Sequence, residues 1–281
     1  MFNKIIAFIN EKYTKIDETS KDFIYTLRKR CALRIETEEK VELKYLTEND
    51  ALYTERSDSQ TSDNISEIIQ KNEVVAITGD AGMGKSSLLL KMHSQYYKKN
   101  IPVLAFEENT IFQDDKNNIY SNLLETIRKR KDKQIILIDT FDNTISTHPD
   151  FDPVRIKINA LQRAGAKIVF FSRPEDIHKL ISNVPEAKEI KLEKFSEETI
   201  KRNLYKYIKA AYKGISSKET TELMEYIYNN QSLRDLIKIP LHMRMLFEIY
   251  APKEIPDLHR ITAHELFQIY YVFKAKTNDR L

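Results

Sequence analysis

Glycine is scarce in this chain, which has five glycines among 281 residues. An average protein carries roughly 7% glycine, about four times this share. Three of the five lie within one eight-residue segment, Gly79–Ser86. Because glycine allows backbone conformations that other residues avoid, this clustering indicates a loop whose shape depends on it.

Cysteine and long apolar runs are also scarce. The single cysteine, Cys31, excludes an internal disulfide framework and favours a reducing compartment, so we expect a cytoplasmic protein. The apolar run Ile5–Ile9 is too short for the core of a signal peptide, and no segment approaches the length of a membrane span. The sequence therefore predicts no membrane association.

Charge of one sign is not in large excess. The formal net charge of +3 is too small to indicate nucleic-acid binding, and none is predicted. The basic runs Arg28–Arg30 and Arg128–Lys131 fall at the ends of predicted helices, where they complement the helix dipole. The six histidines are scattered and lack metal-ligand spacing, so no metal site built by the protein alone is expected.

The glycine-rich segment matches G-x-x-x-x-G-K-[ST], the phosphate-binding P-loop. It follows an apolar run, Val74–Thr78, that reads as a buried strand, and precedes a predicted helix at 86–98. In this context the loop N–H groups and the helix N-terminus bind phosphate. The alternative is a glycine turn between strand and helix. The predicted nucleotide-binding residues are Gly79, Asp80, Ala81, Gly82, Met83, Gly84, Lys85, Ser86 and Ser87.

Two of these residues have assigned tasks. Lys85 is expected to reach the terminal phosphates, and Ser86 to place its hydroxyl on Mg²⁺. A carboxylate that could also bind Mg²⁺ ends the predicted strand Gln134–Asp139, where it follows four aliphatic residues. Asp139 is predicted to hold Mg²⁺ opposite the Ser86 hydroxyl.

A third site follows the strand Lys167–Ser172, which leaves Arg173 at its C-terminal end. Open α/β sheets bind their ligands at that edge. A guanidinium there can contact the γ-phosphate and report its presence. The alternative is a helix start, with Ser172 as the cap and Arg173 in solvent.

Short apolar runs alternate with helical patterns from residue 73 to 194, within a predicted domain of residues 64–194. This alternation predicts an α/β P-loop domain, a parallel sheet flanked by helices. The expected strands are Val74–Thr78, Pro102–Phe106, Gln134–Asp139, Lys167–Ser172 and Glu189–Leu192, and the expected helices are near 86–98, 118–131, 153–164 and 174–182.

Different patterns flank this domain. Residues 1–35 show helical spacing interrupted near Asp17–Ser20, which predicts two helices, and residues 36–63 read as a polar linker. Residues 195–260 read as a small all-α domain, with helix caps at Ser196 and Ser216. A further capped helix starts near Thr262 within residues 261–281.

Five segments in this order and spacing resemble NACHT domains, which are P-loop ATPases of the STAND class in innate-immune and cell-death receptors. The resemblance covers about residues 60–281. The segments are Gly79–Ser86, Asp139–Asp142, Phe171–Pro174, Leu192–Glu198 and Ile239–Leu246.

The resemblance implies a signalling switch that binds ATP or ADP with Mg²⁺ and self-associates through its nucleotide-binding domain when ATP is bound. It also implies that Arg173 senses the γ-phosphate and that Pro240 packs against adenine from the helical domain. Residues 261–281 are similar to the start of the family's winged-helix domain. The chain ends before the histidine of that domain, so we expect a fragment of a longer receptor whose downstream domains are missing.

The chain departs from the family at the hydrolytic site, where Asp142–Asn143 stands in place of Asp-Glu. Because asparagine cannot accept a proton, the resemblance implies slow hydrolysis with Asp142 as the surviving base. An alternative is a scaffold that never hydrolyses and holds ADP as a structural ligand. A P-loop kinase and an AAA+ remodeller acting on nucleic acid fit less well, because the later half of the chain is a helical bundle and the net charge is small.

Overall fold

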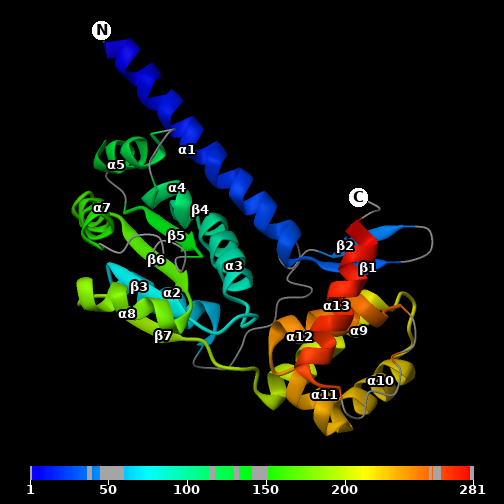
Figure 1. The fold of residues 1–281 in the computed structure, drawn as a ribbon. Helices are drawn as coiled ribbons and strands as arrows, with labels where there is room; N and C mark the ends of the chain where they lie inside the picture. Colours follow the sequence, from blue (N-terminus) through cyan, green and yellow to red (C-terminus); the bar gives the residue numbers. More distant parts are fainter. Residues whose placement is uncertain are drawn as a thin grey trace. The chain divides into compact units, whose positions relative to one another are not determined.

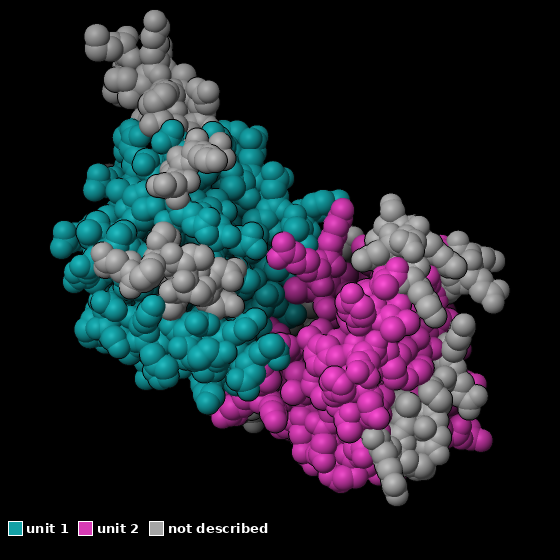
Figure 2. Space-filling view, in the orientation of Figure 1, with its two compact units in different colours: residues 1–28, 62–81, 85–192 teal, residues 29–61, 82–84, 193–281 magenta. Residues whose placement is uncertain are grey.

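The computed structural model describes most of the chain. For residues 2–13 and 276–278 it describes the backbone alone. The described ranges are 2–36, 40–44, 60–113, 118–129, 133–140, 151–252, 255 and 261–278. These residues form two compact units, coloured separately in Figure 2. The first unit contains residues 1–28, 62–81 and 85–192, and the second contains 29–61, 82–84 and 193–281.

A five-stranded parallel sheet forms the centre of the first unit (Figure 1). Its strands are β3 (Val74–Thr78), β4 (Val103–Glu107), β5 (Ile135–Asp139), β6 (Lys167–Ser172) and β7 (Lys188–Lys191). They lie in the order β4-β5-β6-β3-β7. The predicted strands are confirmed to within one residue at each end.

Helices cover both faces of this sheet, as Figure 1 shows. On one face, side chains of β3–β6 form a buried cluster with α5 (Ile119–Lys129), α7 (Asp152–Arg163) and α8 (Pro174–Asn183). On the other, α3 (Lys85–Lys98) packs against β4, β5 and β6, next to α2 (Ser62–Lys71). A short helix after β4, α4 (Glu108–Phe112), was not predicted.

The first helix departs from the sequence expectation. The prediction of two helices broken near Asp17–Ser20 is wrong, because α1 runs without interruption from Phe2 to Cys31. No proline or glycine stands at the expected break, and its polar side chains find partners along the helix. Asp17 pairs with Lys21 at 2.6 Å, and the Thr19 hydroxyl donates to the Lys15 carbonyl at 2.8 Å. The buried Ser20 hydroxyl accepts the Ala105 N–H at 2.9 Å, so α1 contacts the edge strand β4.

The second unit consists of an antiparallel hairpin and a set of helices. The hairpin joins β1 (Leu33–Glu36) to β2 (Val41–Lys44), in a region expected to contain helix and linker. Residues 45–59, most of that expected linker, lie outside the described residues. The helices are α9 (Glu197–Ala211), α10 (Ser217–Asn229), α11 (Gln231–Leu236), α12 (Pro240–Tyr250) and α13 (Ala263–Asn278).

Helix caps explain where the helices of this unit start. The Ser196 side chain accepts the Thr199 N–H, and Ser216 forms a reciprocal capping box with Glu219. A similar pair of bonds joins Thr262 and Glu265. These caps confirm the predicted starts, since each satisfies N–H groups that have no partner within the helix.

A buried carboxylate joins three elements of the second unit. Glu248 of α12 is 2% exposed and accepts the Arg34 N–H of β1 at 3.1 Å. It also accepts the Tyr270 hydroxyl of α13 at 2.6 Å and lies 3.0 Å from the Lys274 ammonium. Burial raises the pKa of Tyr270, and the Glu248 charge raises it further. The phenol therefore remains a donor at neutral pH, and the carboxylate keeps its partners.

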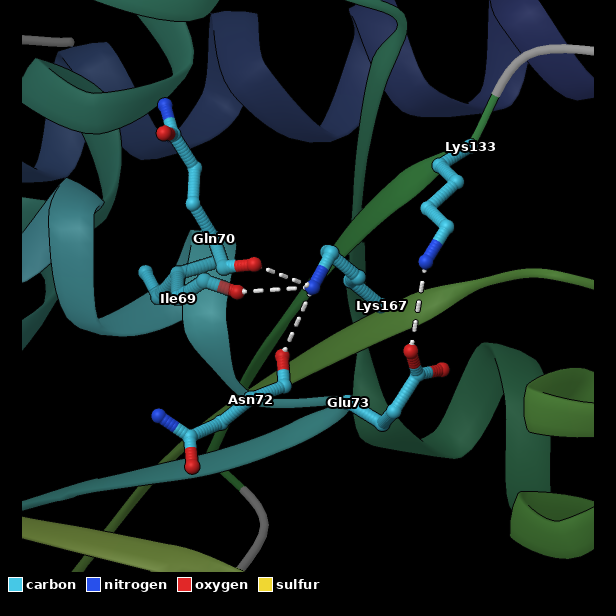
Figure 3. A network of polar contacts seen from close by, with 6 residues as sticks. All are labelled: Ile69, Gln70, Asn72, Glu73, Lys133 and Lys167. Atoms are coloured by element: carbon cyan, nitrogen blue, oxygen red, sulfur yellow. Dashed lines mark hydrogen bonds and ion pairs between the residues drawn. The ribbon is translucent and has the colours of Figure 1, made fainter.

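One lysine closes the last turn of α2 at the N-terminal edge of the sheet (Figure 3). Lys167, at the start of β6, is 8% exposed. Its ammonium donates to the carbonyls of Ile69, Gln70 and Asn72 at 3.1, 2.8 and 3.1 Å. Burial lowers the pKa of Lys167. The carbonyl groups at a helix end have no helical partner, and a cation there also complements the helix dipole.

No helix in the part of the chain that the structure describes combines the length and apolar character needed to cross a membrane.

Replacing Lys167 should therefore destabilise the first unit. Lys167→Met keeps the length of the side chain but leaves buried carbonyls without a donor, so we expect a loss of about 1–3 kcal/mol in the free energy of unfolding. Lys133→Met is the matched control, because Lys133 makes an exposed pair with Glu73 at 3.4 Å. Urea unfolding measures both. Equal effects of the two substitutions would show that the Lys167 bonds contribute nothing.

Candidate functional site

The glycine loop predicted to bind phosphate occupies the turn between β3 and α3. Gly82 and Gly84 both have φ of +81°, a conformation that side chains with a Cβ rarely adopt. Helix α3 begins at Lys85, directly after the loop. The loop therefore has the strand–loop–helix context that the sequence predicted.

Lys85 folds back over its own loop. Its ammonium donates to the carbonyls of Gly79 and Asp80, the latter at 3.2 Å. These two hydrogen bonds hold the Lys85 ammonium beside the loop, and phosphate oxygens could replace the carbonyls as acceptors. A compact ammonium on a flexible stem is suited to this exchange.

Ser86 and Asp139 are brought together from α3 and β5. The Ser86 hydroxyl donates to the Asp139 carboxylate at 2.8 Å. Asp139 is 3% exposed and is the last residue of β5. Mg²⁺ prefers oxygen ligands and usually retains waters beside one or two carboxylates and substrate phosphates. A hydroxyl and a carboxylate within hydrogen-bond distance fit that requirement.

Strand β6 lies between β3, which leads into the glycine loop, and β5, which ends in Asp139. Its last residue, Ser172, is completely buried, and among the described residues its hydroxyl has no hydrogen-bond partner. Arg173 follows at the N-cap of α8 and is exposed. The Ser172 side chain does not cap that helix, because the N-cap position is held by Arg173, whose side chain makes no capping hydrogen bond.

The segment after Asp139 is described only as far as Thr140. Asp142 and Asn143 lie outside the described residues, so their assignment stays a prediction. Thr140, directly after Asp139, has φ of +57°. Such a value is unusual for a β-branched residue, and backbone strain of this kind concentrates at functional sites.

Helix α12 contacts the tip of the glycine loop. Gly82–Gly84 belong to the second unit together with α12. The Leu241 N–H donates to the Gly82 carbonyl at 3.1 Å. A Cβ built on Gly82 would lie 2.8 Å from the Leu241 Cβ and 3.2 Å from Ile239. Pro240 is the first residue of α12, so it stands beside this contact.

The environment of His242, in the same helical turn, favours a neutral ring. Burial lowers the pKa of His242, a bond between Nδ1 and the Leu236 carbonyl at 3.1 Å raises it, and the Lys194 charge lowers it. The net shift is downward, so this histidine adds no positive charge to the first turn of α12 near neutral pH.

The sequence did not predict a role for two residues at these positions, Glu107 and Leu241. Glu107 ends β4 and is the register partner of Asp139, whereas the predicted strand stopped at Phe106. A signal was present, because a carboxylate directly after an apolar strand is the same pattern that identified Asp139. The contact of Leu241 with Gly82 had no sequence signal, since it depends on tertiary packing.

A family model described as "Protein of unknown function (DUF815)" matches residues 19–147. That stretch is less than half of the chain, and its description carries no activity. No curated protein matches the chain by sequence.

Solved structures resemble the fold. The S. cerevisiae Hsp104–ADP complex matches with a TM-score of 0.52 at 13% identity, over 83% of this chain and 34% of that one. Domain III of the Thermotoga maritima replication initiation protein DnaA matches with 0.46 at 19% identity, over 75% and 90%. A replication initiator DnaA bound to AMPPCP and single-stranded DNA matches with 0.44 at 13% identity, over 79% and 78%.

The sheet order and the likeness to the Hsp104 structure show an α/β fold of the P-loop NTPase type, with a five-stranded parallel sheet flanked by helices and a helical region after it. The α/β fold class is confirmed. The chain spans about a third of the Hsp104 chain, and at this identity the likeness concerns the fold alone. The absence of a nucleic-acid partner stays a prediction.

Two substitutions test the phosphate and magnesium assignments. Lys85→Ala should abolish measurable binding of ADP, because it removes the positive charge assigned to the phosphate oxygens. The melting temperature of the empty protein should change little, because a lysine ammonium at a loop contributes little to packing. Ser86→Ala should weaken binding only when Mg²⁺ is present, because the hydroxyl is assigned to the metal. Isothermal titration with and without Mg²⁺ measures both. Unchanged affinity in Lys85→Ala would disprove the phosphate site.

Proposed function

We propose that this chain is an ATP/ADP-binding switch of the NACHT type, which hydrolyses ATP slowly and self-associates according to the bound nucleotide. The observation that carries the proposal is the bond between the Leu241 N–H and the Gly82 carbonyl, at 3.1 Å. Within the second unit, it joins the tip of the loop assigned to phosphate binding to the first turn of α12.

The coupling has a simple physical basis. A P-loop binds phosphate through its backbone N–H groups, so its conformation depends on what it holds. The Gly82 carbonyl and the neighbouring N–H groups belong to one short, close-packed segment. A change in the loop therefore changes the position or strength of the Leu241 contact. Conversely, α12 favours one loop conformation, and linkage requires the two effects to be equal in free energy.

Discrimination between ATP and ADP needs groups that contact the γ-phosphate. Lys85 supplies one positive charge at the loop, and Arg173 supplies a second after β6. Ser86 and Asp139 would hold Mg²⁺, which bridges phosphate oxygens when bound. A ligand shifts a conformational equilibrium only by its difference in affinity for the two states. Lys85 and Arg173 are the groups that provide this difference here.

The signalling role rests on the motif resemblance of residues 60–281, together with this coupling. Pro240, at the start of α12, is assigned to contact adenine, and Asp142 is the base that the resemblance implies. The main alternative remains a scaffold that holds ADP without hydrolysis. Both readings require nucleotide binding, and they differ in what ATP does.

Titration and mass measurements distinguish the two readings. We expect ADP and the ATP analogue AMPPCP, each with Mg²⁺, to bind, and ADP at about 100 times its dissociation constant to stabilise the protein by about 2.7 kcal/mol. Light scattering should give a larger mass with AMPPCP than with ADP. Single-turnover hydrolysis should proceed below the ~1 s⁻¹ low end of typical enzyme rates. Equal mass with both nucleotides would favour the scaffold, and no binding would reject both readings.

The loop–helix contact can be tested separately. Gly82→Ala should lower ADP affinity and stability, because φ is +81° and the new Cβ would meet Leu241 at 2.8 Å. Such strain costs about 1–3 kcal/mol. Gly214→Ala is the matched control, since its φ is +74° with nothing within 4 Å of the built Cβ.

A double-mutant cycle isolates the contact from the backbone strain. Leu241→Gly removes the Cβ that the new methyl group would meet, so the double variant Gly82→Ala/Leu241→Gly should regain part of the ADP affinity lost in Gly82→Ala. Strict additivity of the two substitutions would show that α12 does not act on the loop through this packing.

A further inference from the structure

Glu107 places a second carboxylate beside Asp139. It is the last residue of β4 and is half-buried, and its Cα is paired in register with that of Asp139 on β5. Neighbouring strands lie about 4.8 Å apart. The two acidic residues therefore end adjacent strands at the same edge of the sheet.

The alternation of the strands places both side chains on one face. Leu104 and Phe106 of β4 belong to the buried cluster with α5, α7 and α8, as do Ile136 and Ile138 of β5. Successive side chains of a strand point to opposite faces, so Glu107 and Asp139 point to the other face. That face carries α3, which packs against both strands.

The Ser86 bond confirms this direction for Asp139, since Ser86 lies on α3 and donates to the carboxylate at 2.8 Å. Glu107 is thus on the same side of the sheet as the hydroxyl and carboxylate assigned to Mg²⁺. Its side chain is one methylene longer than that of aspartate and extends farther from the strand. A carboxylate in this position can reach a water next to the phosphates without displacing Asp139 from Ser86.

The segment after Asp139 provides a weaker case for the general base. The residue directly after it is Thr140, which carries no carboxylate, and Asn143 cannot accept a proton. Asp142 is the base implied by resemblance, whereas Glu107 has a position fixed by sheet register.

We propose that Glu107 is the general base for the hydrolysis assigned to this site, an inference that rests on the proposed function. Its carboxylate orients a water and accepts one proton from it. The water oxygen forms a bond to the γ-phosphorus while the bond from that phosphorus to the bridging oxygen of ADP breaks, and the electron pair of that bond stays on ADP. The proton then leaves Glu107 for solvent. The products are ADP, inorganic phosphate and one proton.

The test compares four proteins: wild type, Glu107→Gln, Asp142→Asn and Glu125→Gln. Glutamine keeps the size of the side chain but cannot accept the proton. Glu125 is the matched control, because it is an exposed carboxylate on α5 that pairs with Lys129. Each protein is assayed for single-turnover ATP hydrolysis and for AMPPCP affinity with and without Mg²⁺.

We expect Glu107→Gln to reduce the hydrolysis rate about 10²–10⁴-fold, the usual contribution of general-base catalysis. AMPPCP affinity should stay within about twofold of wild type in both conditions, since a twofold change is well below the tenfold that 1.4 kcal/mol produces. Glu125→Gln should match wild type throughout.

Several results would overturn the inference. Hydrolysis by Glu107→Gln close to the wild-type rate would do so, as would a large loss in Asp142→Asn alone. A loss of the Mg²⁺ effect on AMPPCP affinity in Glu107→Gln would make Glu107 a metal ligand instead. If Glu107→Gln does not fold, Glu107→Asp replaces it, and an unchanged hydrolysis rate there would contradict the assignment.

The controls separate this inference from the proposed function. Wild-type protein that binds no AMPPCP would reject both. Wild-type protein that binds AMPPCP but shows no hydrolysis at all would reject the base and leave nucleotide binding standing.

Discussion

Parallel pairing of the strands is the constraint on which the candidate site depends. In a parallel sheet the carboxyl ends of all strands meet at one edge, so residues far apart in the chain become neighbours there. Because β6 pairs with both β3 and β5, the P-loop, Asp139 and Arg173 all follow strands that are adjacent in the sheet. The order β4-β5-β6-β3-β7 brings Glu107 to the same edge. A different strand order would separate these groups while leaving each motif intact in the sequence.

The charges at this edge are consistent with the proposed binding of a polyanion together with a metal ion. Asp139 and Glu107 supply negative charge on neighbouring strands, while Lys85 and Arg173 supply positive charge after β3 and β6. Two carboxylates about one strand spacing apart repel each other unless a cation or a hydrogen bond compensates. The Ser86 hydroxyl provides such a bond to Asp139. Bound Mg²⁺ would supply the cation, which couples phosphate binding to the balance of charge at the edge.

The second unit has its own polar centre. Glu248 bonds to groups from β1 and α13 while remaining buried, so it fixes the position of α12 within this unit. Removing a partner from a buried charge is more costly than removing an exposed ion pair. The first turn of α12 is the part that meets Gly82, and its position therefore depends on how firmly α12 is held. The contact at the loop tip is a consequence of packing at both ends of one helix.

The local patterns of the sequence were enough for the strands, the loop and the helix caps. Strand Val74–Thr78, the glycine loop and the box at Ser216 each depend on residues within a few positions of one another, where backbone sterics and local hydrogen bonds decide. The same reasoning failed at Asp17–Ser20, because a polar stretch in a helix is tolerated when its side chains find partners nearby. It also missed the hairpin of β1 and β2.

Tertiary structure decided what no short window of sequence contains. The register of Glu107 with Asp139 depends on which strands pair, and the contact of Leu241 with Gly82 joins residues more than 150 positions apart. Such contacts form only when burial of apolar surface repays the loss of chain entropy between distant segments. The sequence by itself determined the P-loop motif between a strand and a helix, and the carboxylate that ends β5. Packing alone decided which further carboxylate and which helix stand beside it, because long-range pairing is a property of the whole core.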